Sequence, residues 1–484
     1  MGLYIGLDLG TTKIAGVLYD SERNKIREML SYPHNALRVS GPFYEMDVNK
    51  TIRLADAILK KIGAGSTVNG IGISTQMHGC LFVDRHNRPQ SRLVAWQDQR
   101  CLLPYPGEPG KNFLRKIIEM TGEDVFYDTG TKVSTGFLGP TVFWFHKKRL
   151  LPKAARVCFL GDYLASILTG EPVSPDVTCA GSSGFYDIKR KEWLWSAIER
   201  LGIPAEIFPE VGETGSVLGF SKNTAVLRAI GDNQASIFGS AGYLDKTLLL
   251  NVGTGSQSSL KIDKFLRHKG LDTRYFMNQD YLLVGACLSG GKTLAIAERF
   301  LAEIGRKIFH KKENLLYEKM KGVLKNHKNI SSPILCGPFF CGTREEPDKK
   351  GFLALIREEN FRLPDFLFSL MEGIIFELYS FYEKMGSPKI SRVVGAGNGM
   401  RRNPLLGEIA ARLFHKPLVI SQVEEEAAAG SAFLAASRLE KGFDVNGALK
   451  SAGYGKVFNP ERKKAGIYQE RYRIYQKMEE SLSD

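Results

Sequence analysis

Residues Leu3 to Leu18 read LYIGLDLGTTKIAGVL, and this stretch decides the fold. Two arms rich in Leu, Ile and Val flank a turn with Gly10 and two threonines, a pattern that predicts a strand, a tight turn and a second strand. The backbone N–H groups of such a turn, together with the threonine hydroxyls and Lys13, are suited to holding phosphate oxygens. Asp8 ends the first arm, where its carboxylate could hold a hydrated Mg²⁺ over the same phosphates. A plain buried hairpin with a solvated lysine explains the same residues, so other parts of the chain must decide.

The pattern returns half a chain later. Residues 248–256 read LLLNVGTGS and restate residues 5–13, which read IGLDLGTTK, at an offset of 243 in a chain of 484 residues. A repeat at half length predicts two similarly built domains, which we place at 1–243 and 244–484. Each half mixes strands with helices, so we expect an α/β fold with the ligand in a cleft between the halves.

The composition limits the class of protein. A chain of 484 residues is too long for one core, and its 43% hydrophobic and 24% charged residues are typical of a soluble globular protein. No segment has about 18 consecutive apolar residues, so we expect no membrane partner. The start of the chain lacks a signal-peptide pattern, and seven scattered cysteines form no CxxC motif, which favours a cytoplasmic protein without zinc or disulfides. The net charge of +14 comes from short, dispersed basic runs, so it favours anionic small molecules over nucleic acid.

Hydrophobic periodicity predicts further elements in both halves. We expect strands at 70–74, at 281–286 and from 392, and helices at 49–63, 140–150, 160–170, within 229–242, from 293, at 364–384, 404–413 and 423–436, and past 459.

Three glycine-rich turns each follow an apolar strand, at Gly10, at Gly253 and at 395–399. Glycine admits positive backbone dihedrals and lets a phosphate or purine approach the backbone closely. The first two turns could grip the phosphates of a nucleotide from opposite sides of a cleft, and the third could lie against the base. Residues 286–293 (ACLSGGKT) also approximate a P-loop. Because Ala286 replaces its first glycine and no later strand clearly ends in an aspartate for Mg²⁺, we interpret them as a nucleotide-side loop of another fold.

Two further groups of polar residues are candidates for chemistry. Asp232 lies in GDNQA (231–235) at the start of a predicted helix, where it is either an N-cap or a base that accepts the proton of a hydroxyl attacking a γ-phosphate. QMH at 76–78 and WQDQR at 96–100 follow apolar strands and supply donors, acceptors and an indole face for a polyol. A histidine in such a place is also commonly an ordinary satisfied side chain.

Five motifs occur in one order: DLGTT at 8–12, QMHG at 76–79, GDNQA at 231–235, NVGTG at 251–255 and GAGN at 395–398. In this ordered set the chain resembles the FGGY carbohydrate kinases over nearly its whole length. The resemblance implies two actin-like domains of the ribonuclease H type that flank a catalytic cleft, with ATP and Mg²⁺ in the cleft and the sugar mainly on the first domain. The implied partners are small molecules, a ketose and ATP, and a homodimer is compatible with the sequence.

The same resemblance implies a role for each motif residue. Asp232 is the expected catalytic base, and Asp8 and Asp232 are the expected Mg²⁺-associated carboxylates. The expected sugar-binding residues are Gln76, Met77, His78, Trp96, Asp98 and Asp232. The expected ATP-binding residues are Gly10, Thr11, Thr12, Lys13, Gly253, Thr254, Gly255, Gly291, Gly397 and Asn398.

Within the family, the QMHG segment resembles the kinases of ketoses. WQDQRC at 96–101 and GTREEPD at 342–348 look closer to kinases of sedoheptulose, whereas the Asp232–Asn233 pair is similar to kinases of xylulose. We therefore expect phosphorylation of a ketose at its terminal hydroxyl, with sedoheptulose as the substrate and D-xylulose as the alternative. A non-kinase ATPase of the actin-like superfamily would share the phosphate turns but would not need the sugar set. A sugar-sensing regulator would need a helix-turn-helix, of which we find none.

Overall fold

Strands and helices alternate along both halves of the chain. The computed structural model describes residues 2–127, 129–130, 132–311, 316–325, 333–343 and 345–482, so Arg344 of the GTREEPD segment lies outside the described residues. The strands of the first half are β1 (Leu3–Leu9), β2 (Lys13–Asp20), β3 (Lys25–Pro33), β4 (Leu37–Ser40), β5 (Phe43–Met46), β6 (Val68–Thr75), β7 (Leu81–Val83), β8 (Leu93–Val94), β9 (Arg156–Cys158), β10 (Tyr186–Asp187), β11 (Glu192–Trp193), β12 (Val217–Ser221), β13 (Thr224–Leu227) and β14 (Ile230–Gly231). Its helices are α1 (Val48–Lys61), α2 (Phe113–Thr121), α3 (Asp124–Tyr127), α4 (Leu138–Lys147), α5 (Leu160–Thr169), α6 (Val177–Gly181), α7 (Trp195–Arg200) and α8 (Asp232–Ala241).

The second half has the same alternation. Its strands are β15 (Thr247–Val252), β16 (Ser256–Ile262), β17 (Asp272–Tyr275), β18 (Tyr281–Cys287), β19 (Leu335–Gly337), β20 (Phe352–Ala354), β21 (Arg392–Ala396), β22 (Leu418–Ser421) and β23 (Tyr454–Phe458). Its helices are α9 (Gly291–Lys307), α10 (Leu316–Lys325), α11 (Leu363–Lys384), α12 (Gly397–Arg402), α13 (Pro404–Phe414), α14 (Glu426–Leu439), α15 (Val445–Gly453) and α16 (Arg462–Ser481).

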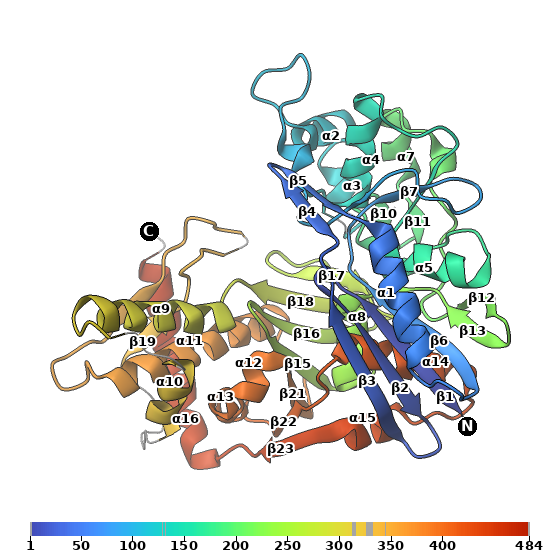
Figure 1. Cartoon of the computed structure of the whole chain (residues 1–484). Coiled ribbons are helices and arrows are strands. Elements are labelled where there is room, and N and C mark those ends of the chain that lie inside the picture. The colour runs from blue at the N-terminus through green and yellow to red at the C-terminus, as the bar shows by residue number, and fades with distance from the viewer. Residues whose placement is uncertain are drawn as a thin grey trace.

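Each copy of the repeated stretch forms the central hairpin of a seven-stranded sheet (Figure 1). The first sheet has the order β12-β13-β6-β1-β2-β3, with β14 beside β6, and the second has the order β23-β22-β21-β15-β16-β18-β17. β1 and β15 occupy equivalent places, because each has an antiparallel neighbour on one side (β2 or β16) and a parallel neighbour on the other (β6 or β21). The sequence repeat is thus a repeat of topology, and the predicted two-domain α/β class is confirmed.

Several predicted elements form with shifted ends. The helix predicted at 423–436 is α14, which begins at Glu426 and extends to Leu439. The predicted glycine turn at 395–399 is wrong in form, because β21 ends at Ala396 and α12 begins directly at Gly397. Of the three glycine turns only this one uses a positive dihedral, with φ of 83° at Gly397, whereas Gly10 and Gly253 keep ordinary backbone angles.

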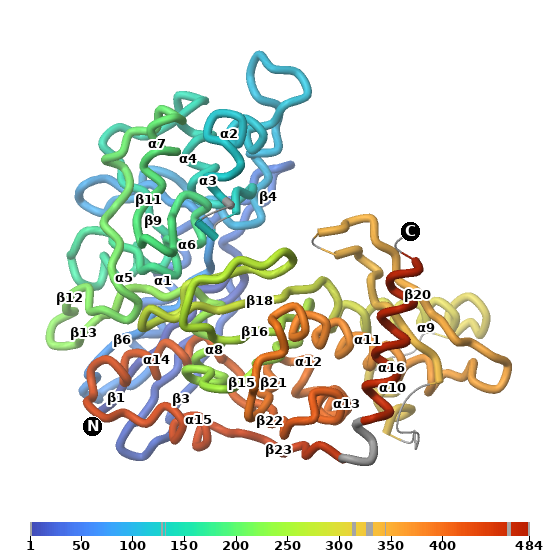
Figure 2. Tube along the Cα trace, turned by 180° about the vertical axis from the view of Figure 1, so that it is seen from behind, coloured from blue at the N-terminus to red at the C-terminus, as the bar shows by residue number. Residues whose placement is uncertain are grey.

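Helix α14 crosses from the second half and packs on the first sheet, where Figure 2 shows it beside β1 and β6. The approach is close enough to require glycine. A Cβ atom on Gly6 would lie 1.9 Å from the backbone oxygen of Ala428, and one on Gly72 would lie 1.9 Å from that of Ser431. α14 therefore belongs to the second half by sequence and to the first sheet by packing.

Helix α8 makes the complementary connection. It follows the first sheet, and its Phe238 shares one buried cluster with Leu249 and Val394 of the second sheet and with Phe433 of α14. α8 and α14 cross where the added Cβ of Gly430 would lie 1.9 Å from the backbone oxygen of Ala235. These two helices hold the sheets together. Among the described residues, no helix is both long and apolar enough to cross a membrane.

We expect replacement of Gly430 with alanine to destabilise the protein by about 3 kcal/mol, because the new methyl group meets backbone that cannot move without separating the two helices. Chemical denaturation followed by circular dichroism measures the change. The matched control is Gly466→Ala in α16, where an added Cβ meets no atom within 4 Å, so alanine should stabilise by up to about 1 kcal/mol. Equal stability of Gly430→Ala and the wild type would contradict the close packing.

Candidate active site

Two carboxylates meet where three parallel strands end. β6 lies between β1 and β14, and its Ser74 is in register with both Asp8 and Ile230. The Ser74 hydroxyl donates to Asp8 Oδ1 at 2.9 Å. Asp232 begins α8 directly after β14, so it comes close to Asp8. Burial, helped by the negative charge of Asp232, raises the pKa of Asp8 to about 7.

Asp232 is the first residue of α8 rather than its cap. The N-cap is Gly231, and no side chain caps the helix in the described structure, so the N-cap interpretation of Asp232 is wrong. Burial raises the pKa of Asp232 to about 6, against the opposing effects of the Asn233 backbone N–H and the Arg274 charge. Asp232 as a whole residue is partly exposed, and its carboxyl group has a pKa above that of an ordinary aspartate, a property that is common at functional sites.

A cavity of about 800 Å³ lies beside the start of α8. Met77 and Gln234 line it, and both lie against Gly231, the residue before Asp232. Asp232 itself is not among the described lining residues. His78 and Trp96 of the predicted sugar set also line the cavity, together with further residues of both halves, among them Gln97, Gln99, Lys132, Ser182, Asp272 and Arg274.

The His78 ring is fixed by its neighbours. Its backbone N–H donates to Ser182 Oγ at 3.0 Å, and Nδ1 lies 2.8 Å from the Ser182 carbonyl oxygen. A carbonyl only accepts, so Nδ1 carries the proton and Nε2 of the neutral ring is the acceptor. The ring stacks on Phe137 at 4.0 Å between centroids. The histidine thus presents a defined tautomer on the cavity wall.

Gln76 and Trp96 both contact the first glycine turn, and Trp96 also lines the cavity. The Thr11 hydroxyl donates to Gln76 Oε1 at 3.2 Å and accepts from Trp96 Nε1 at 3.1 Å. Gln76 is buried, and its amide nitrogen also lies 3.1 Å from Met46 Sδ. Gln76 therefore contacts Thr11 and is not among the described residues that line the cavity, whereas Trp96 is 48% exposed and lines it.

Asp98 departs from the expectation of a sugar contact. It is fully buried and absent from the described cavity lining. Its carboxylate accepts from Arg100 Nε at 2.8 Å, from Arg100 Nη2 at 3.0 Å and from the Tyr44 backbone N–H at 2.8 Å. Because both carboxylate oxygens accept hydrogen bonds from the arginine and one also accepts from a backbone N–H, this carboxylate stabilises the conformation of the loop. That loop is what places Trp96, Gln97 and Gln99 on the cavity wall.

The predicted nucleotide residues of the second half gather at one place. The Gly291 N–H donates to the Gly253 carbonyl at 2.8 Å, and the Lys292 N–H donates to that of Thr254 at 3.0 Å. The P-loop-like stretch thus opens α9 beside the second glycine turn. An added Cβ on Gly397 would lie 2.4 Å from Asn251 Oδ1, so the third glycine site is adjacent as well.

The first turn is joined to this group by consecutive glutamates. Lys13 Nζ lies 2.6 Å from Glu425 Oε1, so the lysine predicted to face phosphate is paired with a carboxylate in this structure. Glu426 accepts from the Gly397 N–H at 3.1 Å and from Arg401 at 2.5 Å. Thr12 and Thr254 are exposed on their turns, and Asn398 accepts from Arg401 at 3.1 Å.

Family models identify the chain. The N-terminal domain of the FGGY family of carbohydrate kinases matches residues 3–242, and the C-terminal domain of that family matches residues 248–439. The chain belongs to this family. FGGY kinases transfer phosphate from ATP to a sugar, so the protein is an ATP-dependent sugar kinase.

Known relatives agree with this assignment. Sedoheptulokinase of Mus musculus is 27% identical, over 90% of this chain and 97% of the mouse protein. Xylulose kinase of Lactococcus lactis is 22% identical, over 100% of this chain and 98% of its own. The crystal structure of xylulose kinase from Rhodospirillum rubrum has the same fold, with a TM-score of 0.86 at 18% identity and 99% coverage of each chain.

Several residues at this candidate site could not be found by motif. Lys132, Asp272 and Arg274 line the cavity but belong to no recognisable pattern. Glu425 and Glu426 stand in an acidic run that the sequence explains equally well as a helix start. Their contacts with Lys13 and Gly397 form only on folding, and these contacts are what bring them to the candidate site.

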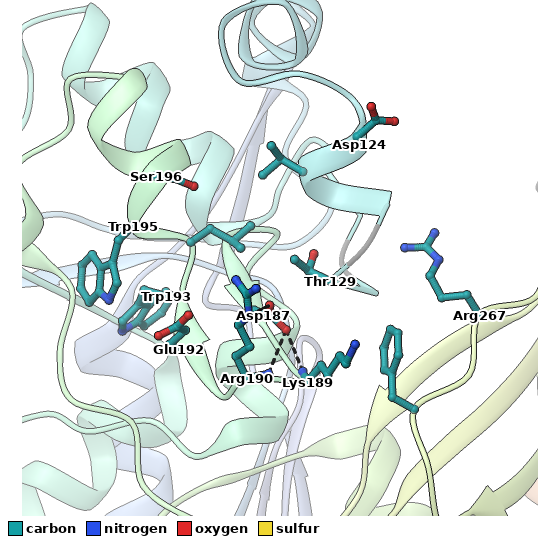
Figure 3. A pocket seen from close by; sticks show the side chains of 13 residues that line it. Asp124, Thr129, Asp187, Lys189, Arg190, Glu192, Trp193, Trp195, Ser196 and Arg267 are labelled. Atoms are coloured by element: carbon teal, nitrogen blue, oxygen red, sulfur yellow. Dashed lines mark hydrogen bonds and ion pairs between the residues drawn. The ribbon is translucent and has the colours of Figure 1, made fainter.

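A second hollow, of about 720 Å³, is distinct from the sugar cavity (Figure 3). Trp193 and Trp195 stand on one side, and Arg267 from the second half reaches in from the other. Asp187 Oδ1 accepts the backbone N–H groups of Lys189 and Arg190 at 2.8 and 3.0 Å. None of the predicted site residues is among the described residues that line it, whereas Met77, His78 and Trp96 of the predicted sugar set line the first cavity.

Replacement of Asp98 with alanine is expected to destabilise the kinase by about 3 kcal/mol, because the buried Arg100 guanidinium loses a bidentate carboxylate and keeps Glu45 as its carboxylate partner among the described residues. Thermal unfolding and steady-state kinetics measure the effect. The comparison variant is Trp96→Ala, which should raise KM for the sugar with little loss of stability because the indole is half exposed on the cavity wall. If Asp98→Ala instead raised KM for the sugar at unchanged stability, Asp98 would be a sugar ligand after all.

Proposed function

We propose that the protein phosphorylates a ketose at its terminal primary hydroxyl and that the substrate is sedoheptulose, with sedoheptulose 7-phosphate as the product. The observation that carries the proposal is the cavity beside Asp232, whose wall combines His78, Gln97 and Gln99 with the indole of Trp96. A volume of about 800 Å³ has room for a seven-carbon sugar. The WQDQRC motif and the 27% identity to mouse sedoheptulokinase, against 22% to the Lactococcus xylulose kinase, support the heptulose.

Asp232 is the proposed catalytic base. Its carboxylate accepts the proton of the sugar hydroxyl as the hydroxyl oxygen attacks the γ-phosphorus of ATP and the bond to the β-phosphate oxygen breaks. A pKa of about 6 keeps Asp232 ionised at neutral pH while leaving it basic enough to bind the proton. Met77 and Gln234 flank the position from which the sugar approaches.

The proposed ATP site consists of the glycine turns. Gly10 to Lys13 would meet the phosphates from the first half, and Gly253 to Gly255 with Gly291 would meet them from the second. The N–H groups of Gly10, Gly253 and Gly291 already donate to carbonyl oxygens of Lys13, Gly255 and Gly253, so these three glycines would hold the shape of the loops while the threonine hydroxyls and the other N–H groups of the turns meet phosphate. α9 directs its N-terminus toward this group, an orientation that favours anions. Gly397 and Asn398 would lie nearer the base. Lys13 must exchange Glu425 for phosphate in order to contribute.

The chemistry of Asp8 and Asp232 fits Mg²⁺, because both offer hard carboxylate oxygens. No group of three or more His, Cys, Asp or Glu side chains that could hold a metal ion occurs in the described part of the chain. This agrees with an ion that keeps most of its waters and takes further oxygens from phosphate, as Mg²⁺ commonly does. When bound, Mg²⁺ would neutralise charge on the phosphates. Asp8, held by Ser74, would orient toward it.

A coupled ADP-release assay across sedoheptulose, D-xylulose, D-ribulose and D-fructose tests the substrate. We expect kcat/KM for sedoheptulose to exceed that for each other ketose by about tenfold or more, because shorter sugars leave polar groups of the cavity unpaired. Phosphorus NMR of the product should place the phosphate on the terminal carbon. Preference for D-xylulose would replace the heptulose proposal with the alternative that the Asp232–Asn233 pair favours. ADP release that no sugar stimulates would contradict both.

The pH dependence of kcat/KM of the wild-type enzyme should reflect the ionisation of the proposed base, Asp232. Because the raised pKa of Asp232 is about 6 and only the ionised form accepts a proton, protonation of Asp232 alone should make kcat/KM for the sugar fall about tenfold per pH unit below that value, and protonation of Asp8, whose raised pKa is about 7, should add to the fall. Initial rates between pH 4.5 and 8, with ATP saturating and protein stability checked at each pH, measure the profile. A rate that stays level down to about pH 4 would contradict a base with a raised pKa.

A further inference from the structure

The second sheet carries one strand more at its outer edge than the topological repeat requires. In the first sheet the series from β1 runs β1-β2-β3, and in the second it runs β15-β16-β18 and continues to β17. Among the described residues of the first half, no strand pairs with the far edge of β3. β17 lies at the junction of the two halves (Figure 1). β17 is therefore an extra strand of the second half, and it lies next to the first half.

The alternation of β17 puts two charged residues on one face. Thr273 and Tyr275 are buried, whereas Asp272 and Arg274 are partly exposed, as the two-residue period of a strand dictates. Both charged residues line the cavity proposed to bind the sugar, as do Thr273 and Tyr275. The second half thus supplies part of the wall of a cavity whose other residues come mainly from the first half.

Arg274 is held by two acceptors at once. Its Nη1 donates to Asn233 Oδ1 at 2.8 Å, and its Nη2 donates to Asp272 Oδ2 at 3.2 Å. Asp272 is itself paired with Lys132 of the first half. A planar guanidinium can serve two such acceptors in a fixed geometry, which a lysine ammonium cannot do as well. The direction of Arg274 is therefore set before any substrate arrives.

Both polar atoms of the Asn233 side-chain amide form hydrogen bonds with residues of the second half. While Oδ1 accepts from Arg274, Nδ2 donates to Gln257 Oε1 at 3.1 Å. Gln257 lies in β16, in register with Asn251 of β15, so it stands just beyond the Gly253–Gly255 turn. The neighbouring Gln234 also donates to the backbone oxygen of Tyr275 at 3.0 Å. The first turn of α8 is thus tied to the second sheet.

We propose that Arg274 is a positioning residue for sugar phosphorylation, which holds Asn233 and thereby keeps Asp232 in line with the phosphate turn at Gly253–Gly255. This inference rests on the proposed role of Asp232 as base. The path Arg274–Asn233–Gln257 links the sugar cavity, the start of α8 and the hairpin that carries the second glycine turn. Its loss leaves every group present but lets the acceptor hydroxyl and the γ-phosphate drift out of alignment, to which transfer rates are sensitive.

A double-mutant cycle on positions 274 and 233 tests the proposal. We expect Arg274→Met and Asn233→Ala each to lower kcat by about 10- to 100-fold, with KM for ATP within about threefold of the wild type. Because both act through one hydrogen bond, the double variant should be no slower than the slower single variant. Arg274→Lys should recover only part of kcat, since its ammonium cannot hold both acceptors in the same geometry.

The matched control is Arg438→Met. Arg438 Nη2 donates to Asn278 Oδ1 at 2.8 Å, an arginine–asparagine contact of the same length at the turn between β17 and β18, away from the described cavity lining. We expect this variant to keep the wild-type kcat. Thermal unfolding of each variant confirms that the rates belong to folded protein.

Three results would overturn the positioning role: losses that multiply in the double variant, which would mean that Arg274 acts independently of Asn233; a kcat of Arg274→Met within about threefold of the wild type; or an equal loss in Arg438→Met. All rates are taken with the ketose that the wild type uses best, so a failure of the sedoheptulose proposal leaves this test intact. If Asp232 proved dispensable, the base assignment would fall separately, while the cycle would still report whether positions 233 and 274 act together.

Discussion

The close approach of α14 to the first sheet is the constraint on which the site depends. Glycines at 6 and 72 remove the side chains that would separate the helix from β1 and β6, and Gly430 does the same between α14 and α8. With the helix at backbone contact distance, its leading residues Glu425 and Glu426 reach Lys13 of the first turn and Gly397 of the third. Packing at one end of a helix thus fixes the spacing of two loops that belong to different halves.

The repeat of topology and the asymmetry of its side chains together shape the chemistry. Both halves place a glycine turn after a central strand, but the first carries Asp8 at that strand end and the second carries Asn251. Burial, together with the charge of Asp232, raises the pKa of Asp8, so a nearby cation would help this carboxyl group to ionise. The neutral copy lies against Gly397 instead. The half with the two carboxylates also supplies most residues of the cavity that we propose binds the sugar.

Local pattern was enough to predict the parts of this site that are made by local geometry. The hairpin of Leu3–Leu18, its echo and the place of Asp232 at a helix start all depend on residues close in sequence, so apolar arms and turn residues reveal them. Asp98 shows the limit of local pattern. A polar residue after a strand can contact a ligand or pair with a buried arginine, and the sequence pattern is the same in both cases. The contacts of Arg274 with Asn233 and of Lys13 with Glu425 join residues 41 and 412 positions apart. Only tertiary packing selects such partners.

The central claim is that Asp232 accepts the proton of the sugar hydroxyl in the cleft between the halves. Its most direct test is the variant Asp232→Asn, in which the new side chain has nearly the same shape but cannot act as a base. Rapid-quench single-turnover experiments with ATP and the preferred ketose measure the rate of phosphoryl transfer. Calorimetry measures the affinity for ATP. The account predicts a loss of about 10³-fold or more in the rate of phosphoryl transfer, with the Kd for ATP within about threefold of the wild type. Transfer at the wild-type rate in the folded variant would contradict it.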